Sequence, residues 1–259
     1  MTAPPAPSDR GAAPARVVLV HGAWHRGSSW GPVVTELERR GVPAVAPDLP
    51  VDRPGAGYDA LLGPVLDAAG GAGPVVLAGH SLGGLVAPVA AERLGPDRVR
   101  ALAMVGALVP EPGRAYIERL RAEPGPMVPG YDAGVRRGEG RITYWPDGAT
   151  AASGVYRGVA PELAALGHDD PDGAVAGAVA GLRPQDWSVL KEPSPLTTRP
   201  SGRTVSVVCT ADAVVDPGVG RQAAAGIGAR LVELAGGHFP MLTRPAELAE
   251  VLAGLAAGH

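Results

Sequence analysis

Short apolar runs alternate with longer amphipathic segments along most of this chain. The runs are rich in valine, leucine and alanine and are bounded by glycine, proline or charged residues, which is typical of buried parallel strands. They predict strands at 17–20, 43–46, 75–78, 101–105, 204–209 and 230–234. The amphipathic segments predict helices at 28–40, 58–69, 82–94, 217–226 and 245–257. Regular alternation of strands and helices favours a doubly wound, mostly parallel α/β sheet.

The alternation breaks between the fourth and fifth predicted strands. The interval is too long for a crossover connection and carries helical patterns of its own, at 114–121, 161–166 and 172–182. Proline and glycine clusters, such as the one at 123–130, separate these patterns. We therefore expect residues 110–202 to form an inserted, loosely ordered helical cap on a core made of residues 17–109 and 203–259.

Composition and charge narrow the class of protein. The 259 residues are 46% apolar and carry a net charge of −3, without the run of like charges that favours nucleic acid. Residues 1–16 are rich in alanine and proline and lack the apolar stretch of a signal peptide, so we expect a disordered leader. No apolar stretch is long enough to cross a membrane, and the lone Cys209 lies in a predicted strand, as a buried thiol would. These features predict a soluble, cytoplasmic protein with no nucleic-acid or membrane partner, and they leave its oligomeric state open.

A glycine-flanked serine stands between the third predicted strand and the helix after it. The sequence there is Gly79-His80-Ser81-Leu82-Gly83, followed by Gly84. Glycine two residues before and after a serine allows the tight strand-to-helix turn called a nucleophile elbow, where larger side chains would collide with the strand or helix. The N-terminus of the helix directs N–H groups and a positive dipole at the space above the hydroxyl. The pattern predicts that Ser81 is a nucleophile.

A serine needs a general base to act as a nucleophile at neutral pH. His238 suits this role because it follows the last predicted strand through a short glycine-containing loop, which places it at the carboxyl edge of the sheet. Five further histidines lie in the cap, at the chain end, or close to the first strand and the serine: His21, His25, His80, His168 and His259. These positions suit a base less well, so we predict that His238 is the base.

The base in turn needs an acidic residue to orient it. Asp212 and Asp216 both follow the predicted strand at 204–209, and either gives the chain order serine, aspartate, histidine. Asp216 precedes Pro217 at a predicted helix start and is explained as an N-cap. We therefore favour Asp212, with Asp216 as the second candidate and Glu111 as a weaker third.

An oxyanion would need two backbone N–H donors above the serine. One is the amide of Leu82, the residue after the nucleophile. The loop after the first strand, His21-Gly22-Ala23-Trp24, contains a glycine that lets the backbone approach the reacting centre. We predict that the amide of Ala23 is the second donor.

Several of these segments together resemble a known superfamily. They are Val17-Val18-Leu19-Val20-His21-Gly22-Ala23-Trp24-His25, Gly79-His80-Ser81-Leu82-Gly83-Gly84, Thr210-Ala211-Asp212 with the downstream Pro217 and Arg221-Gln222, and Gly237-His238-Phe239. They resemble the α/β-hydrolase superfamily, and within it the branch of plant methyl-ester esterases, hydroxynitrile lyases and their bacterial relatives. The similarity runs from about Arg16 to the C-terminus and is weak across 111–202.

The resemblance implies a set of roles. It implies Ser81 as nucleophile, His238 as base, Asp212 as acid, and the amides of Ala23 and Leu82 as oxyanion donors, with no cofactor. The lyases of this branch have a threonine after the first-loop histidine and a lysine after the catalytic histidine. This chain has Gly22 and Phe239 at those positions. Both departures favour ester hydrolysis over cyanohydrin cleavage.

The sequence therefore predicts a serine hydrolase that cleaves a carboxylic ester of a small molecule through an acyl-Ser81 intermediate. We expect the cap to close a largely apolar pocket over Ser81 and predict neither a cofactor nor a metal. The candidate pocket residues are Trp24, Tyr116, Met127, Trp145, Tyr156, Trp187, Phe239 and Met241. The alternatives are a thioesterase, lactonase or cyclase that acts on a secondary metabolite, and a hydrolase-fold protein that binds a ligand without turnover.

Overall fold

Runs of valine, leucine and alanine form a central sheet of six parallel strands. The structure, a computed structural model, describes residues 14–200 and 202–258. The strands are β1 (Arg16–Val20), β2 (Ala44–Val45), β3 (Val75–His80), β4 (Val99–Val105), β8 (Thr204–Cys209) and β9 (Arg230–Leu234). They lie in the order β2-β1-β3-β4-β8-β9, and each neighbouring pair is parallel. This arrangement confirms the predicted doubly wound α/β sheet.

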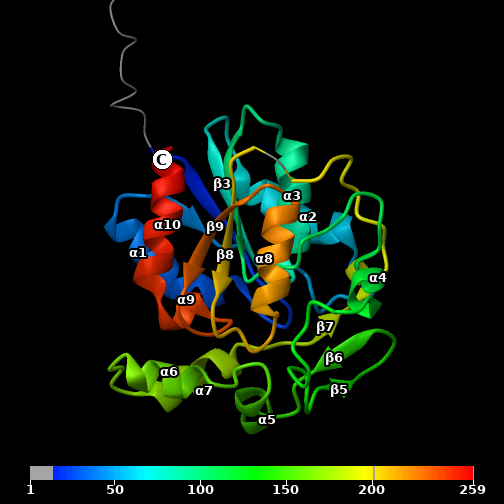
Figure 1. The fold of residues 1–259 in the computed structure, drawn as a ribbon, viewed down its shortest axis with the longest axis vertical. Coiled ribbons are helices and arrows are strands. Elements are labelled where there is room, and N and C mark those ends of the chain that lie inside the picture. The colour runs from blue at the N-terminus through cyan, green and yellow to red at the C-terminus, as the bar shows by residue number, and fades with distance from the viewer. Residues whose placement is uncertain (1–13, 201, 259) are drawn as a thin grey trace, which may run out of the picture.

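Helices cover both faces of the sheet (Figure 1). α1 (Gly31–Arg39) and α10 (Pro245–Ala257) lie on one face, and α2 (Tyr58–Ala69), α3 (Gly83–Leu94) and α8 (Pro217–Gly226) lie on the other. The bounds of α2, α8 and α10 agree with those predicted from the sequence. The helix expected at 28–40 is instead divided into a 3-10 helix, η1 (Gly27–Trp30), and α1, which has a proline in its first turn. Proline suits the first turn of a helix because it has no N–H to leave unpaired.

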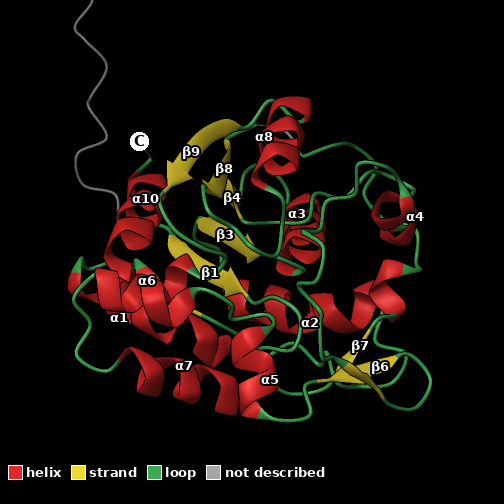
Figure 2. Cartoon of the chain, turned by 60° about the horizontal axis from the view of Figure 1, so that its bottom comes forward, coloured by secondary structure: helices red, strands yellow, loops and turns green. Residues whose placement is uncertain are grey.

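Much of the segment between β4 and β8 lies beyond the carboxyl ends of the strands, and its last part runs back to the opposite end of the sheet, where β8 begins (Figures 1 and 2). Its helices are α4 (Tyr116–Arg121), α5 (Gly148–Ser153), α6 (Val159–Ala165), α7 (Pro171–Ala180) and the 3-10 helix η2 (Ser188–Leu190). Asp170 caps the start of α7 by accepting the N–H of Gly173. That cap explains why α7 begins one residue earlier than predicted.

This segment also contains a small antiparallel sheet that the sequence did not predict. Its strands are β5 (Arg136–Arg137), β6 (Ile142–Tyr144) and β7 (Gln185–Asp186), in that order. Strands of two or three residues with charged and polar members show too little alternation to be distinguished from loops. The segment expected to form a helical cap therefore contains a short sheet beside its helices.

The start of the described chain belongs to the sheet. Ala15 is fully buried and donates its N–H to the carbonyl of Ala256, and Arg16 is the first residue of β1. The end predicted for the leader at 1–16 is therefore too late, because Ala15 and Arg16 belong to the folded core. The leader's residues 1–13 lie outside the described part of the chain.

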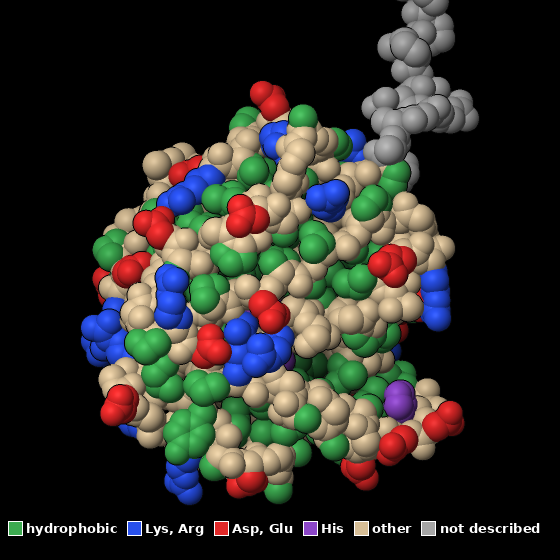
Figure 3. All heavy atoms as spheres, turned by 180° about the vertical axis from the view of Figure 1, so that it is seen from behind, with side chains coloured by type: hydrophobic (Ala, Val, Ile, Leu, Met, Phe, Trp, Pro, Cys, Tyr) green, Lys and Arg blue, Asp and Glu red, His purple; other side chains and the backbone are tan. Residues whose placement is uncertain are grey.

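The predicted burial of the lone cysteine is confirmed, because Cys209 is 1% exposed at the end of β8. Within the described ranges, no helix combines the length and apolar character needed to cross a bilayer. On the face shown in Figure 3, acidic and basic side chains are interspersed and do not form a large area of one sign.

Candidate active site

Ser81 occupies a sharp turn between β3 and α3. Its φ of 51° lies in the left-handed region, which a residue with a side chain adopts only where its surroundings enforce it. The Ser81 N–H donates to the carbonyl of Val105 at 3.1 Å, and the Ser81 carbonyl accepts from the N–H groups of Gly84 and Leu108. These bonds hold the serine at the carboxyl end of β3.

Glycines let the backbone approach closely around this turn. A Cβ at Gly79 would lie 2.5 Å from the carbonyl oxygen of Gly83, and a Cβ at Gly83 would lie 2.4 Å from that of Val20. A Cβ at Gly22, in the loop after β1, would lie 3.0 Å from the Cβ of Ser81. Side chains at these positions would push α3 off the sheet or the loop away from the serine.

His238 and Asp212 form a buried pair. The Nδ1 of His238 lies 2.7 Å from Oδ2 of Asp212, and both side chains are almost completely buried. The second carboxylate oxygen, Oδ1, accepts the backbone N–H groups of Val214 and Val215 at 2.8 Å each. An ionised carboxylate only accepts, so Nδ1 carries the proton and the lone pair of Nε2 is left available.

The two other acidic candidates lie elsewhere. Asp216 accepts the N–H of Val219 at 2.9 Å and caps α8, as its position before Pro217 predicted. Glu111 is exposed in the loop after β4. Of the three, the structure brings Asp212 to the histidine.

The loop that carries His238 is held on both sides. His80, beside the serine, contacts the carbonyl oxygen of His238 through its Nε2 at 2.9 Å, which requires a proton on that nitrogen. Glu162, on α6, accepts the N–H of Gly237 at 2.9 Å and lies 3.4 Å from the Arg244 guanidinium. Both contacts fix the backbone next to the imidazole.

Two unpaired backbone N–H groups near Ser81 are candidates for binding an oxyanion. Ala23 and Leu82 line the same cavity as Ser81 and His238. Among the described residues, the N–H groups of Ala23 and Leu82 donate to no acceptor. Buried backbone donors are rarely left unpaired, and a pair beside a nucleophile is the arrangement that binds a developing oxyanion.

The cavity over Ser81 has a volume of about 110 Å³. Four of the residues predicted for the pocket line it, namely Trp24, Met127, Trp187 and Phe239. Its other lining residues, which the sequence reasoning missed, include His25, Leu108, Leu120, Tyr131, Val155, Leu190 and Val214. Among the described residues that line it, none is lysine, arginine, aspartate or glutamate. The wall is therefore mainly apolar and aromatic.

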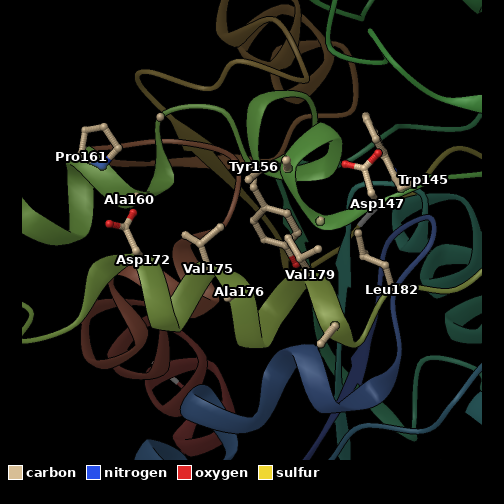
Figure 4. A pocket seen from close by; sticks show the side chains of 15 residues that line it. Trp145, Asp147, Tyr156, Ala160, Pro161, Asp172, Val175, Ala176, Val179 and Leu182 are labelled. Carbon is tan, nitrogen blue, oxygen red and sulfur yellow. The ribbon is translucent and has the colours of Figure 1, made fainter.

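The remaining pocket candidates lie outside this cavity. Tyr116 is buried beside Val109 in a separate surface hollow, and Met241 is buried near α1 and η1. Trp145 and Tyr156 instead line a larger cavity of about 710 Å³ between α5, α6 and α7 (Figure 4). This second cavity adjoins the first, because Trp145 packs edge-on against Trp24 and Tyr156 stacks on Phe239.

Three buried histidines near the site are uncharged at neutral pH. Burial lowers the pKa of His21 to about 3 and the pKa of His25 to about 4. Burial also lowers the pKa of His80 well below its ordinary value, and the neighbouring His238 adds to that effect. The neutral His80 ring lies 4.5 Å from the ring of His238 and so adds no positive charge beside it.

A metal site is not formed by the residues that can be described: within 14–200 and 202–258, no three His, Cys, Asp or Glu side chains are grouped to hold an ion. The site instead combines a serine, a histidine, a carboxylate and two free backbone amides. Such a set suits acyl transfer.

Comparison with known proteins agrees with this geometry. The sequence profile of the alpha/beta hydrolase family matches residues 17–251. The chain belongs to the alpha/beta hydrolase family.

A pyrethroid hydrolase of Sphingobium wenxiniae is 37% identical over 105 residues, which are 38% of this chain and 37% of that protein. A probable esterase, PIR7A, of Oryza sativa is 37% identical over 108 residues, which are 38% of this chain and 40% of that protein. The chain thus covers less than half the length of these curated relatives.

Solved structures cover the chain more fully. A pyrethroid hydrolase from Sphingobium faniae aligns with a TM-score of 0.75 at 26% identity, over 94% of this α/β-hydrolase and 97% of that chain. Polyneuridine aldehyde esterase gives 0.74 at 18% identity, and a methylesterase from Arabidopsis gives 0.70 at 19%, each over 94% of this chain and 99% of the other. The last two likenesses show the fold alone. Together these matches confirm the resemblance to the α/β-hydrolase superfamily.

Proposed function

We propose that this α/β-hydrolase cleaves a carboxylic ester through an acyl-Ser81 intermediate. The observation that carries the proposal is the His238–Asp212 pair, joined at 2.7 Å, in a cavity that also contains Ser81 and two unpaired backbone N–H groups. The relatives named pyrethroid hydrolase and probable esterase support an ester as the substrate. Their match over little more than a third of the chain supports the reaction class and leaves the particular ester open.

The proposed reaction proceeds in two halves. His238 Nε2 takes the hydroxyl proton as Ser81 Oγ attacks the ester carbonyl carbon, and the amides of Ala23 and Leu82 donate to the oxyanion. Collapse breaks the bond to the alcohol oxygen, which leaves with the proton from His238. A water molecule then gives a proton to His238 and attacks the acyl carbon, and Ser81 leaves with that proton as the carboxylic acid is released.

Asp212 supports the imidazole in both halves. It fixes the tautomer with the proton on Nδ1 and stabilises the imidazolium that forms when His238 accepts the serine proton. The two N–H groups that Asp212 accepts from Val214 and Val215 hold its carboxylate in one orientation. The pair therefore stays aligned through the proton transfers.

The cavity wall favours hydrolysis over cyanohydrin cleavage. Release of cyanide requires a cation beside the leaving group, and Phe239 stands after His238 where the lyases have lysine. Among the described residues lining the cavity there is no lysine or arginine. No observation favours a thioesterase, lactonase, cyclase or non-catalytic binding role for this site.

Residues 110–202 are proposed as the cap of the site. Leu120, Met127 and Trp187 reach the cavity from this segment and cover Ser81 with apolar surface. An ester with an apolar acyl or alcohol group matches that surface. The cytoplasmic location and the absence of a nucleic-acid partner stay predictions.

A panel of p-nitrophenyl esters of increasing acyl length tests the proposal. We expect Ser81-dependent release of p-nitrophenol from at least one ester, and no cleavage of mandelonitrile above the background rate. Ser81→Ala is the control for both substrates. Ser81-dependent cyanide release by a protein inert to every ester would contradict ester hydrolysis.

A further inference from the structure

The loop after β1 is held in a strained conformation by residues from the proposed cap. Trp24 has a φ of 62°, a left-handed value that is rare for a bulky side chain and persists only where contacts enforce it. Its backbone N–H donates to Oε1 of Gln185 at 3.1 Å, and its carbonyl accepts the N–H of Arg183 at 2.9 Å. Gln185 is fully buried. The buried Gln185 side chain thus binds the backbone of Trp24, the strained residue in the loop after β1.

The indole of Trp24 is held from the same small sheet. Its Nε1–H donates to Oγ1 of Thr143 at 3.0 Å, and the same oxygen accepts the indole N–H of Trp187 at 2.8 Å. Thr143 on β6 lies directly opposite Gln185 on β7. Side chains at directly opposed positions of an antiparallel pair lie on the same face. One cross-strand pair therefore holds both the backbone and the ring of Trp24.

These contacts fix the peptide next to the proposed oxyanion donor. The peptide between Ala23 and Trp24 has its N–H bound to Gln185 and its carbonyl bound to Nδ1 of His25 at 2.5 Å. A peptide whose N–H and carbonyl are both bound cannot rotate freely. The Ala23 carbonyl belongs to this peptide, so the backbone conformation of Ala23 is restricted. Ala23 lines the cavity that contains Ser81, so the restriction also bears on the position of its free N–H.

We propose that Gln185, supported by Thr143, is a positioning residue for the oxyanion hole. It acts through Trp24 on the direction of the Ala23 N–H and does not itself touch the reacting atoms. The inference rests on the proposed ester hydrolysis. On this proposal, the β5-β6-β7 sheet does more than enclose the substrate. It also increases the reaction rate, because it orients an oxyanion donor.

The test compares an ester with its thionoester, in which sulfur replaces the carbonyl oxygen. Sulfur is larger and a weaker hydrogen-bond acceptor, so a thionoester gains little from well-directed oxyanion donors. The ratio of kcat/KM for p-nitrophenyl acetate to that for O-(p-nitrophenyl) thionoacetate therefore reports the oxyanion hole. Both constants scale with the amount of active protein, so partial misfolding leaves their ratio unchanged.

The first variant is Gln185→Met, which keeps the length of the side chain and removes the acceptor for the Trp24 N–H. We expect the ester-to-thionoester ratio to fall by about tenfold, because one of two donors is misdirected. Gln222→Met is the matched control, since Gln222 is exposed on α8. We expect its ratio to stay within about twofold of wild type.

A second pair of variants keeps the inference testable if Gln185→Met does not fold. Thr143→Val removes the acceptor for the indole at nearly constant shape, and Thr143→Ser keeps it. We expect a fall in the ratio of about threefold for Thr143→Val and recovery in Thr143→Ser. An unchanged ratio in both Gln185→Met and Thr143→Val, even with lower activity, would overturn the positioning role alone. Absence of ester turnover by the wild-type protein would instead overturn the proposed function, and this inference with it.

Discussion

The Glu162 carboxylate accepts the backbone N–H of Gly237 at 2.9 Å, so α6 holds the loop that carries His238. Gly236, one residue earlier, has a φ of 99°, and a Cβ there would lie 1.9 Å from Oε1 of Glu162. The acidic side chain and the glycine backbone thus fit against each other. Arg244, 3.4 Å from the same carboxylate, balances its charge.

This contact predicts a loss of both activity and stability in Glu162→Ala. The variant leaves the Gly237 N–H unpaired and frees the histidine loop, so we expect kcat to fall about tenfold and the free energy of unfolding to fall by about 1–3 kcal/mol. Glu162→Gln retains an acceptor and should retain most of the activity. Ester turnover and urea unfolding measure the two effects, with Glu250→Ala, at an exposed position on α10, as the control. Equal behaviour of the two alanine variants would show that the contact does not matter.

The two aspartates after β8 should respond differently to the same change. Asp212→Asn places an N–H donor against His238 and disturbs its tautomer, so we expect kcat to fall by about 10²-fold or more. Asp216→Asn keeps an oxygen that caps α8, and we expect a change of less than about threefold. Steady-state kinetics of both variants on one ester give the comparison. The reverse order of severity would make Asp216 the acid.

Buried neutral histidines should make the fold sensitive to acid. The folded-state pKa of His21 is about 3 and that of His25 about 4, against an ordinary value of 6.5, and the pKa of His80 is also lowered. Below pH 6.5 the unfolded chain binds protons that the folded chain does not. The free energy of unfolding is therefore constant with respect to these groups above that pH and falls as the pH drops toward the folded values.

Urea unfolding at pH 7.5 and at pH 5.5 measures this loss. His21 and His25 should each remove roughly 1 kcal/mol between these values, and His80 should add to the loss. His168→Ala, at an exposed position, serves as a control for the loss of a histidine side chain. A difference smaller than about 1 kcal/mol would contradict the neutral, buried state of these rings.

Much of the fold could be predicted from the sequence because it depends on local patterns. The bounds of α2, α8 and α10 follow from amphipathic spacing with proline or aromatic starts and glycine ends. The positions of Ser81, Asp212 and His238 follow from glycines around a turn and from strand ends that meet at one edge of a parallel sheet. Each of these signals lies within a few consecutive residues, so it can be interpreted without knowledge of long-range contacts.

The segment between β4 and β8 could not be predicted in the same way. The strands β6 and β7 pair Thr143 with Gln185, residues far apart in the sequence, and neither strand is long enough to show alternation. Composition also could not distinguish Trp187, which lines the cavity over Ser81, from Trp145, which lines the neighbouring one. The side of an aromatic ring that faces a cavity is decided by packing, which the sequence pattern does not specify.

The identity of the nucleophile is the central claim, and covalent labelling tests it most directly. A fluorophosphonate probe should modify the protein once, and mass mapping should place the adduct on the peptide that contains Ser81. Ser81→Ala should take up no label and should lose several orders of magnitude in kcat while it remains folded. A label on another residue, or a Ser81→Ala variant that keeps more than about a tenth of the wild-type kcat, would contradict the acyl-Ser81 mechanism.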